Sequence, residues 1–192
     1  MEQATDRIVS SEDERLILVD EDDNETGFLS KAECHDGEGV LHRAFSIFLF
    51  NDDGELLLQQ RAPGKRLWPL YWSNTCCSHP REGESVDVAA HRRLEDELHT
   101  GGDLEFIYKF TYQASYGELG AERELCHVFL GRVEAPVRPN PTEIQATRFV
   151  SATALEDEFA SRDAPLTPWF RMEWERLADE FADRLARYTA PR

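Results

Sequence analysis

The sequence predicts a protein that combines helices and strands (class α/β, of α+β type), in which a mixed β-sheet is sandwiched between helices. Segments with the character of β-strands outnumber helical ones, and one mid-chain helix over residues 85–98 lies between β-rich segments. With 192 residues, 41% of them hydrophobic, the chain can bury one proper core. We therefore expect a single domain over residues 14–192, preceded by a flexible acidic N-terminal tail over residues 1–13.

The first third of the chain is expected to be mostly extended. Residues 15–20 resemble a short strand, and an extended run resumes at Phe28 after a turn-rich segment. Residues 41–50 are a strongly β-forming run, and residues 51–54 end in the Asp-Gly signature of a hairpin turn. Residues 55–61 are therefore predicted to be the hairpin partner of residues 41–50.

The middle of the chain adds a helix and further strands. Ser85 can cap the helix that runs to about Leu98, and Asp87 lies in its first turn. Two β-rich segments follow, over residues 104–114 and 123–133. A proline-rich break then precedes another predicted strand, over residues 142–150.

The end of the chain is predicted to be helical. Thr153 and Glu156 have the spacing of a capping box, which predicts the start of a short helix. Apolar residues then recur at three- and four-residue spacing, which predicts one closing helix with a core-facing stripe. The stripe consists of Phe170, Trp174, Leu177, Phe181, Leu185 and Tyr188.

The chain is strongly acidic, with a net charge of −17. Such a charge argues against nonspecific binding to nucleic acid or to an anionic membrane. Its 21 basic residues include only the lysines Lys31, Lys65 and Lys109. Many acidic residues and few lysines suit a halophilic protein that stays soluble in concentrated salt. An acidic mesophilic protein from a GC-rich genome explains the composition equally well.

The cysteines and the hydropathy pattern bear on location. No apolar run approaches the ~20 residues that span a bilayer, and the acidic N-terminus lacks the apolar core of a secretory signal. We expect a cytoplasmic location and therefore free thiols rather than disulfides. The cysteines are Cys34, Cys76, Cys77 and Cys126.

Residues 72–80, with the sequence WSNTCCSHP, place a thiol two residues from an imidazole. Residues i and i+2 share a face of a strand, so Cys77 and His79 can face one site while Cys76 points the other way. A thiol can transfer a proton, attack carbon or bind a metal, and an imidazole can bind a metal or shuttle protons. The stretch alone leaves redox, metal and nucleophilic roles open.

A candidate metal-binding set is spread along the chain. It comprises His35 and His42 on either side of a glycine-containing loop, His79, and the pair Glu122 and Glu124 on one face of a predicted strand. Three imidazoles and two carboxylates would suit Zn²⁺, Mn²⁺ or, less well, Mg²⁺. Spacing alone also allows surface or core histidines and two glutamates that solvate an edge strand.

The helix over residues 85–98 resembles the Nudix signature, G-x5-E-x7-R-E-U-x-E-E-x-G-U. Ser78, Arg93 and His99 depart from it, because they stand at the first Gly, at the Glu after the Arg and at the last Gly. Arg93 replaces a carboxylate by a positive charge, which suits diphosphate binding but not the usual hydrolytic metal cluster. An ordinary acidic amphipathic helix is the alternative. The matching positions are Glu84, Arg92, Leu94, Asp96 and Glu97.

A basic set stands out in this acidic chain. Arg61 and Lys65 flank the Pro63-Gly64 loop, and Lys31 and Arg93 can join them. A local cationic cluster in such a chain would be a natural anion site. Ordinary surface charge is the alternative.

Together these stretches resemble type I isopentenyl-diphosphate isomerases, a family built on the Nudix fold. The resemblance covers roughly residues 16–187, and the order and spacing of its motifs make it specific. The motifs are Lys31-x3-His35, His42-Arg-Ala-Phe45, Arg61-Ala-x2-Lys65, Trp68-Pro69, Trp72-x-Asn74, Cys77-Ser-His79-Pro80, Gly83-Glu84-Ser85, Arg92-Arg93-x3-Glu97-Leu98, Glu122-x-Glu124-x-Cys126 and Pro168-Trp169.

The resemblance implies that residues 14–192 form one Nudix-type isomerase domain active in isoprenoid biosynthesis. It implies interconversion of isopentenyl and dimethylallyl diphosphate by 1,3-allylic proton transfer through a carbocation-like state. Cys77 and Glu124 match the two catalytic positions, and Tyr112 would assist the carboxyl by hydrogen bonding. Trp169 matches an aromatic residue that lines the hydrocarbon pocket, although a core tryptophan is the alternative.

The same resemblance implies the cofactors. One divalent ion, Mn²⁺, Mg²⁺ or Zn²⁺, is expected at a protein-bound site made by His35, His42, His79, Glu122 and Glu124. A second ion, Mg²⁺, is expected on the substrate diphosphate through Glu97. The implied diphosphate contacts are Lys31, Arg61, Lys65 and Arg93.

Two other classes of function remain as alternatives. One is a Nudix pyrophosphohydrolase of a nucleoside diphosphate derivative, which Arg93 and the Cys-Ser-His-Pro segment argue against. The other is a metal-stabilised interaction module without catalysis. For the isomerase we expect a small-molecule allylic or homoallylic diphosphate as the only partner, with no nucleic acid and no membrane, and a monomer.

Overall fold

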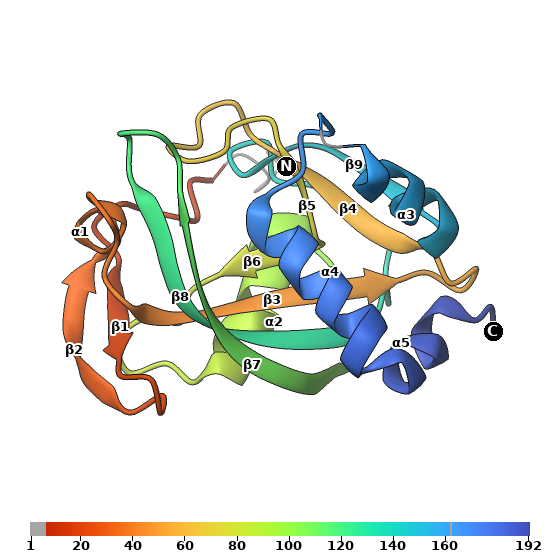
Figure 1. Ribbon diagram of the computed structural model, residues 1–192, viewed down its shortest axis with the longest axis horizontal. Coiled ribbons are helices and arrows are strands. Elements are labelled where there is room, and N and C mark those ends of the chain that lie inside the picture. Colours follow the sequence, from red (N-terminus) through yellow and green to blue (C-terminus); the bar gives the residue numbers. More distant parts are fainter. Residues whose placement is uncertain (1–6, 162) are drawn as a thin grey trace, which may run out of the picture.

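The computed structural model describes residues 7–161 and 163–192 (Figure 1). Its elements in chain order are β1 (Arg15–Val19), β2 (Glu25–Ser30), α1 (Lys31–His35), β3 (His42–Phe50), β4 (Leu56–Arg61), β5 (Trp72–Ser73), β6 (Cys76–Ser78), α2 (Val86–Leu98), β7 (Leu104–Ser115), β8 (Ala121–Arg132), β9 (Ile144–Val150), α3 (Ala152–Ala160), α4 (Pro168–Glu180) and α5 (Ala182–Thr189). Within the described ranges, no helix is long and apolar enough to cross a membrane.

The strands form one mixed sheet with an apolar cluster on each face. β3 and β8 run parallel, and the other strand pairs are antiparallel. Side chains of α2 pack on one face, and side chains of α3, α4 and α5 pack on the other. Along β3 the residues alternate between the two clusters, as the two-residue period of a strand requires. The predicted α+β architecture, a mixed sheet between helices, is confirmed.

β3 and β4 do not form the extended hairpin that the sequence predicts. They pair only at Phe50 and Leu56, next to the turn, and then diverge (Figure 1). Thr75 lies between them: its hydroxyl accepts the Leu49 N–H at 2.9 Å and donates to the Leu57 carbonyl at 2.7 Å. The segment around Thr75 fills the gap between the diverging strands β3 and β4, because β5 pairs with β4 and β6 pairs with β3. This insertion positions the thiol-bearing stretch at the centre of the sheet.

Two helix predictions also require correction. α3 is capped by Ser151, whose hydroxyl accepts the N–H of Ala154, so Thr153 lies inside the helix. The predicted single closing helix is divided into α4 and α5 at Phe181, which has non-helical backbone angles. The Phe181 ring stacks on Tyr108 with centroids 4.9 Å apart. The break thus keeps an apolar side chain on the core while the chain changes direction.

Residues 7–13 belong to the segment predicted to be a flexible tail. The Val9 side chain is buried, and its carbonyl accepts a hydrogen bond from Arg93 Nη1 at 2.6 Å. The carbonyl of Arg7 accepts one from Asn140 Nδ2 at 2.8 Å. This part of the segment therefore packs against the domain. Residues 1–6 lie outside the described ranges, and the flexibility of the tail stays a prediction.

Glu173 of α4 carries a core carboxyl group that sequence reasoning missed. The side chain is fully buried, and the Cys126 thiol lies 3.4 Å from its Oε1. Its Oε2 has no hydrogen-bond partner among the described residues. Burial raises the pKa of Glu173 to about 8, so the carboxyl is protonated in neutral solution.

Replacing Glu173 by glutamine should stabilise the protein at alkaline pH. Between the ordinary carboxyl pKa of 4.5 and the folded value of about 8, the unfolded chain binds fewer protons than the native one. Wild-type stability therefore falls as the pH rises through this window, by roughly 2–4 kcal/mol, and a glutamine does not titrate. Urea unfolding at several pH values on both sides of this window measures the difference.

Glu175→Gln is the matched control for this change, because Glu175 is exposed on the same helix. Its unfolding free energy should follow the wild-type pH dependence. Equal pH dependence in wild type and Glu173→Gln would contradict the protonated state of the buried carboxyl.

Candidate active site and metal centre

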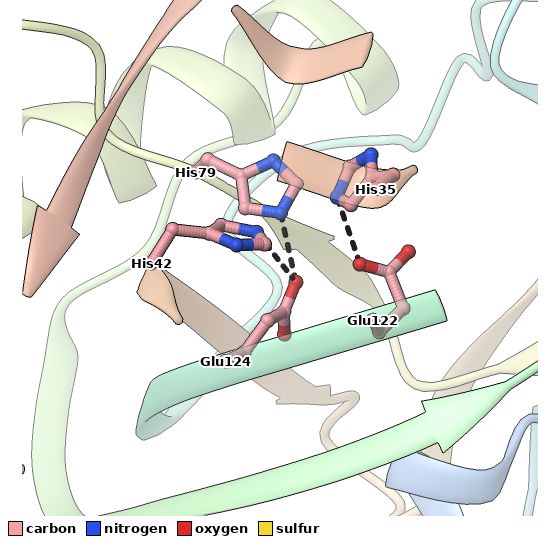
Figure 2. A group of neighbouring side chains, drawn as sticks. All are labelled: His35, His42, His79, Glu122 and Glu124. Atoms are coloured by element: carbon pink, nitrogen blue, oxygen red, sulfur yellow. Dashed lines mark hydrogen bonds and ion pairs between the residues drawn. The ribbon is translucent and has the colours of Figure 1, made fainter. Parts of the chain in front are cut away.

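Three imidazoles and two carboxylates converge in the interior of the domain (Figure 2). His35 ends α1, His42 begins β3, His79 follows β6, and Glu122 and Glu124 lie in β8. One ligand atom from each of these buried residues can be chosen so that all five lie within 4.8 Å of one another. The structure thus brings together the whole metal-binding set predicted from the sequence.

Local structure explains why these side chains meet. β3 and β8 pair in parallel with His42 opposite Glu124, and Glu122 lies on the same face of β8 two residues earlier. α1 is fixed by a capping box, in which the Ser30 hydroxyl accepts the Glu33 N–H and the Glu33 carboxylate accepts the Ser30 N–H. The last residue of this short helix is the first imidazole of the set.

The ligand atoms point toward a common centre (Figure 2). Glu124 Oε1 lies 2.8 Å from His79 Nε2 and 3.7 Å from His42 Nε2. Glu122 Oε2 lies 2.9 Å from His35 Nε2. His42 Nδ1 donates to the backbone carbonyl of Val40 at 2.7 Å, so Nε2 is the ring nitrogen that faces the other members of the set.

The residues fit a divalent cation. His35 Nε2, His42 Nε2 and Glu122 Oε2 are buried and have no hydrogen-bond partner among the described residues. Such atoms destabilise a fold unless something satisfies them. His35 and Glu122 are close without hydrogen-bond geometry, as two ligands of one ion would be. A mixed nitrogen and oxygen set suits Zn²⁺ or Mn²⁺ and, less well, Mg²⁺.

The protonation states of the set also suit a cation. Burial lowers the pKa of His79 well below its usual value, and the charges of His42 and His35 add to this effect. His79 is therefore neutral, which is the form that binds metal. Although burial opposes ionisation, His35 lowers the pKa of Glu122, and His42 together with a tyrosine hydrogen bond lowers that of Glu124. Both carboxylates are anionic.

The two neighbouring cysteines face opposite sides of the sheet. Cys76 is fully buried in the cluster beneath α2, beside residues such as Leu94. Cys77 is half-buried, packs against the other cluster and lines a pocket together with His79 and Glu124. Burial raises the pKa of Cys77 to about 12, although the charge of Arg61 opposes this shift. Cys77 is therefore a protonated thiol in the pocket.

Glu124 is held from two sides. Its Oε1 faces the imidazoles, and its Oε2 accepts a hydrogen bond of 2.6 Å from the Tyr112 hydroxyl. The antiparallel pairing of β7 and β8 places Tyr112 directly opposite Glu124. Burial and the carboxylate charge raise the pKa of Tyr112 well above its usual value, so its hydroxyl stays a donor.

The same pocket is lined by the four cations predicted to bind diphosphate, Lys31, Arg61, Lys65 and Arg93. Each has protein partners. Lys31 Nζ donates to Ser10 Oγ at 2.6 Å and lies 3.7 Å from a carboxylate oxygen of Glu12. Sequence reasoning missed Ser10 and Glu12, which also line the pocket, because nothing in the local sequence sets them apart.

Arg93 and Glu97 form a buried pair one helical turn apart. Arg93 Nε donates to Glu97 Oε1 at 2.8 Å, and Nη2 donates to the same oxygen. Glu97, which the sequence predicts to hold Mg²⁺, is not among the residues that line the pocket. It lies beneath Arg93. Glu143, which sequence reasoning missed, pairs with Arg93 and Lys65 from the segment before β9.

Trp169 is both a core residue and a pocket residue. It is buried, its Nε1 donates to Ser73 Oγ at 3.1 Å, and it lines the pocket. The guanidinium carbon of Arg61 lies 5.3 Å from the centroid of its ring. Arg61 also donates to the carbonyls of Leu67 and Trp68, so this residue connects the cations predicted to bind diphosphate with Trp169.

Known proteins resemble this chain in sequence and in fold. The NUDIX domain model matches residues 40–170. "Isopentenyl-diphosphate Delta-isomerase 1" of Photorhabdus laumondii is 41% identical over 174 residues, which cover 90% of this chain and 99% of that protein. "Isopentenyl-diphosphate Delta-isomerase" of Nocardia farcinica is 42% identical over 153 residues, which cover 79% and 87%.

Solved structures support the fold alone, because their sequence identities are low. The protein DR0079 of Deinococcus radiodurans superposes with a TM-score of 0.66 at 21% identity, covering 91% of this chain and 99% of its own. A MutT protein of Methanosarcina mazei Go1 gives 0.59 at 20% identity, covering 73% and 95%.

Proposed function

This chain belongs to the isopentenyl-diphosphate Delta-isomerases of the NUDIX superfamily, and from that premise we propose that Cys77 and Glu124 carry out its proton transfers. The chain is an enzyme that interconverts isopentenyl and dimethylallyl diphosphate by 1,3-allylic proton transfer. One observation carries the assignment of the two groups. A protonated thiol and an ionised carboxylate line one pocket that also holds the cationic set.

The chemistry needs two such groups. In one direction a proton is added at C4 of the homoallylic substrate and another is removed from C2, so one group loses a proton while the other gains one. In the reverse direction the same two groups exchange roles. Protonation of an alkene leads toward a tertiary carbocation that water would trap, so a pocket that shields the two proton-transfer groups from bulk water suits the reaction.

We assign the remaining pocket residues to substrate and metal. A divalent ion held by the five His and Glu ligands would fix the orientation of Glu124 and lower its pKa. The π face of Trp169 would stabilise positive charge that develops on the hydrocarbon chain. Glu97, now paired with Arg93, remains the proposed ligand of diphosphate-bound Mg²⁺. The proposed diphosphate contacts are Lys31, Arg61, Lys65 and Arg93.

We further propose a cytoplasmic monomer whose partner is the small-molecule diphosphate. The net charge of −17 supports the absence of nucleic-acid and anionic-membrane partners. The same charge supports a halophilic source, for which a loss of stability at low salt is the test.

NMR of a reaction in D₂O tests the activity. Incubation of metal-loaded protein with isopentenyl diphosphate and Mg²⁺ should produce dimethylallyl diphosphate that carries deuterium, because both proton-transfer groups exchange with solvent. Release of phosphate or a monophosphate would instead identify a Nudix hydrolase. No reaction by folded, metal-loaded protein would contradict both enzymes and favour an interaction module.

A further inference from the structure

Glu143 is a buried carboxylate for which the proposed chemistry has no role. It lies immediately before β9, and the residue is 3% exposed. Its Oε2 pairs with Lys65 Nζ and lies 3.4 Å from Nη2 of Arg93. Its backbone carbonyl accepts the N–H of Ala62 at 2.9 Å. One residue thus contacts both α2 and the loop that carries Lys65.

The charges near Glu143 show that its carboxylate offsets repulsion among neighbouring cations. Burial lowers the pKa of Lys31, and the charges of Lys65 and Arg93 lower it further, whereas Glu143 acts in the opposite direction. Burial opposes ionisation of Glu143 itself, but Lys65 and Arg93 hold its pKa below the usual range. Glu143 is therefore an anion amid three cations that would otherwise repel one another.

Glu143 and Glu97 engage Arg93 in different ways. Glu97 takes two N–H donors of the guanidinium from the same helix, which fixes the direction of that group. Glu143 reaches one nitrogen from outside the helix while it holds Lys65. Glu97 therefore orients one cation, whereas Glu143 couples two.

A charge count distinguishes two forms of the ligand. The four proposed diphosphate contacts and the two buried carboxylates paired with them, Glu97 and Glu143, together carry a net charge of about +2, and Arg66, which also lines the pocket, is paired with Asp36. A free allylic diphosphate carries roughly three negative charges, and its Mg²⁺ complex carries about one. Glu12 is half exposed beside Lys31, where solvent screens its charge. Loss of the Glu143 charge would leave about +3, which matches the free anion better.

We propose that Glu143 is a positioning residue of the diphosphate subsite. It holds Lys65 beside Arg93 and limits the positive charge of the subsite, which shifts binding from free diphosphate toward its Mg²⁺ complex. The inference rests on the diphosphate-binding role proposed above for these two cations. The proposal adds Glu143 as a residue that influences whether the substrate binds as the free diphosphate or as its Mg²⁺ complex.

Calorimetric titration with inorganic diphosphate, with and without Mg²⁺, tests the proposal. The protein is first loaded with its divalent metal, and its metal content is measured before and after each titration. Wild type should bind the Mg²⁺ complex more tightly than free diphosphate, because Glu97 is the proposed ligand of the diphosphate-bound ion. In Glu143→Gln the ratio of the two affinities should fall by at least ~10-fold, because the free anion gains more from the added positive charge.

Two further variants separate charge from structure. Glu156→Gln removes an exposed carboxylate far along the chain, in α3, and should leave the ratio unchanged. The double variant Lys65→Gln/Glu143→Gln removes the pair together and keeps the net charge of the subsite. It should weaken binding of both forms and retain the preference for the Mg²⁺ complex, and this measurement stands if the single variant does not fold.

Several outcomes would overturn the proposal. An unchanged affinity ratio in folded Glu143→Gln would overturn it, as would loss of the Mg²⁺ preference in the double variant. Failure of folded, metal-loaded wild type to bind diphosphate in either form would overturn the role of the cations as well. The D₂O assay stays independent of these results, because isomerisation by wild type with an unchanged ratio would refute only the role of Glu143.

Discussion

Replacing Cys77 by alanine should lower the isomerisation rate by roughly 10²–10⁴-fold, which is the usual contribution of a positioned proton-transfer group. Cys77 is the cysteine that lines the pocket with Glu124, and burial keeps it as a thiol that can give up and regain a proton. Steady-state kinetics with isopentenyl diphosphate measures the loss. Circular dichroism and metal content should be unchanged, because the side chain is half-buried and is not one of the five converging metal ligands.

Cys76→Ala is the matched control, because the same atoms are removed one residue away. Cys76 packs beneath α2 on the opposite face of the sheet. Its loss should reduce stability by about 1 kcal/mol through a small core cavity and should leave the rate within a few-fold of wild type. Full activity of Cys77→Ala together with an inactive Cys76→Ala would refute the choice of thiol.

Replacing Glu124 by glutamine should lower kcat by roughly 10⁴-fold even at saturating metal, because the residue is proposed to transfer a proton as well as bind the ion. Metal affinity should also fall, by more than the ~10–100-fold typical for loss of a residue that only hydrogen-bonds to a metal ligand. Rates measured over a range of Mn²⁺ concentrations separate the two effects. Removal of all metal by a chelator should abolish activity reversibly.

Glu122→Gln is the comparison that isolates proton transfer. Glu122 lies two residues earlier on the same face of β8 and belongs to the same metal set, but no proton-transfer role is proposed for it. Its variant should need more metal and then recover most of the activity. Tyr112→Phe should lose only about 10-fold, because it removes one hydrogen bond to Glu124. Equal kcat values for the two glutamine variants at saturating metal would refute the role of Glu124.

Short-range sequence logic predicted the parts of the site that depend on one strand or one helix. The two-residue period separates Cys77 from Cys76 and places Glu122 beside Glu124, and both relations hold in the structure. The position of Ser85 at the start of α2 is confirmed, because its hydroxyl accepts the Val88 N–H. Periodicity does not indicate that segments far apart in the sequence form one site. The combination of motifs predicted that they do.

Features that depend on tertiary contacts could not be predicted from the sequence. Glu143 is one of 38 acidic residues, and only its position against Lys65 and Arg93 distinguishes it. The Asp-Gly turn is a sound local signal, but the Thr75 hydroxyl takes the hydrogen bonds that would extend the hairpin. The helix break at Phe181 coincides with stacking of its ring on Tyr108, a partner in another element. Each error arises where a contact between elements overrides a local preference.

The parallel pairing of β3 with β8 has a consequence for how the protein matures. His42 and Glu124 become neighbours only when these two strands meet, and β4, β5, β6, α2 and β7 lie between them in the chain. Closing so long a loop is a slow, late step compared with forming a helix or a local turn. We therefore expect the ion to enter a nearly finished fold instead of nucleating it. Bound metal would then mainly slow unfolding and shift the folding equilibrium toward the native state.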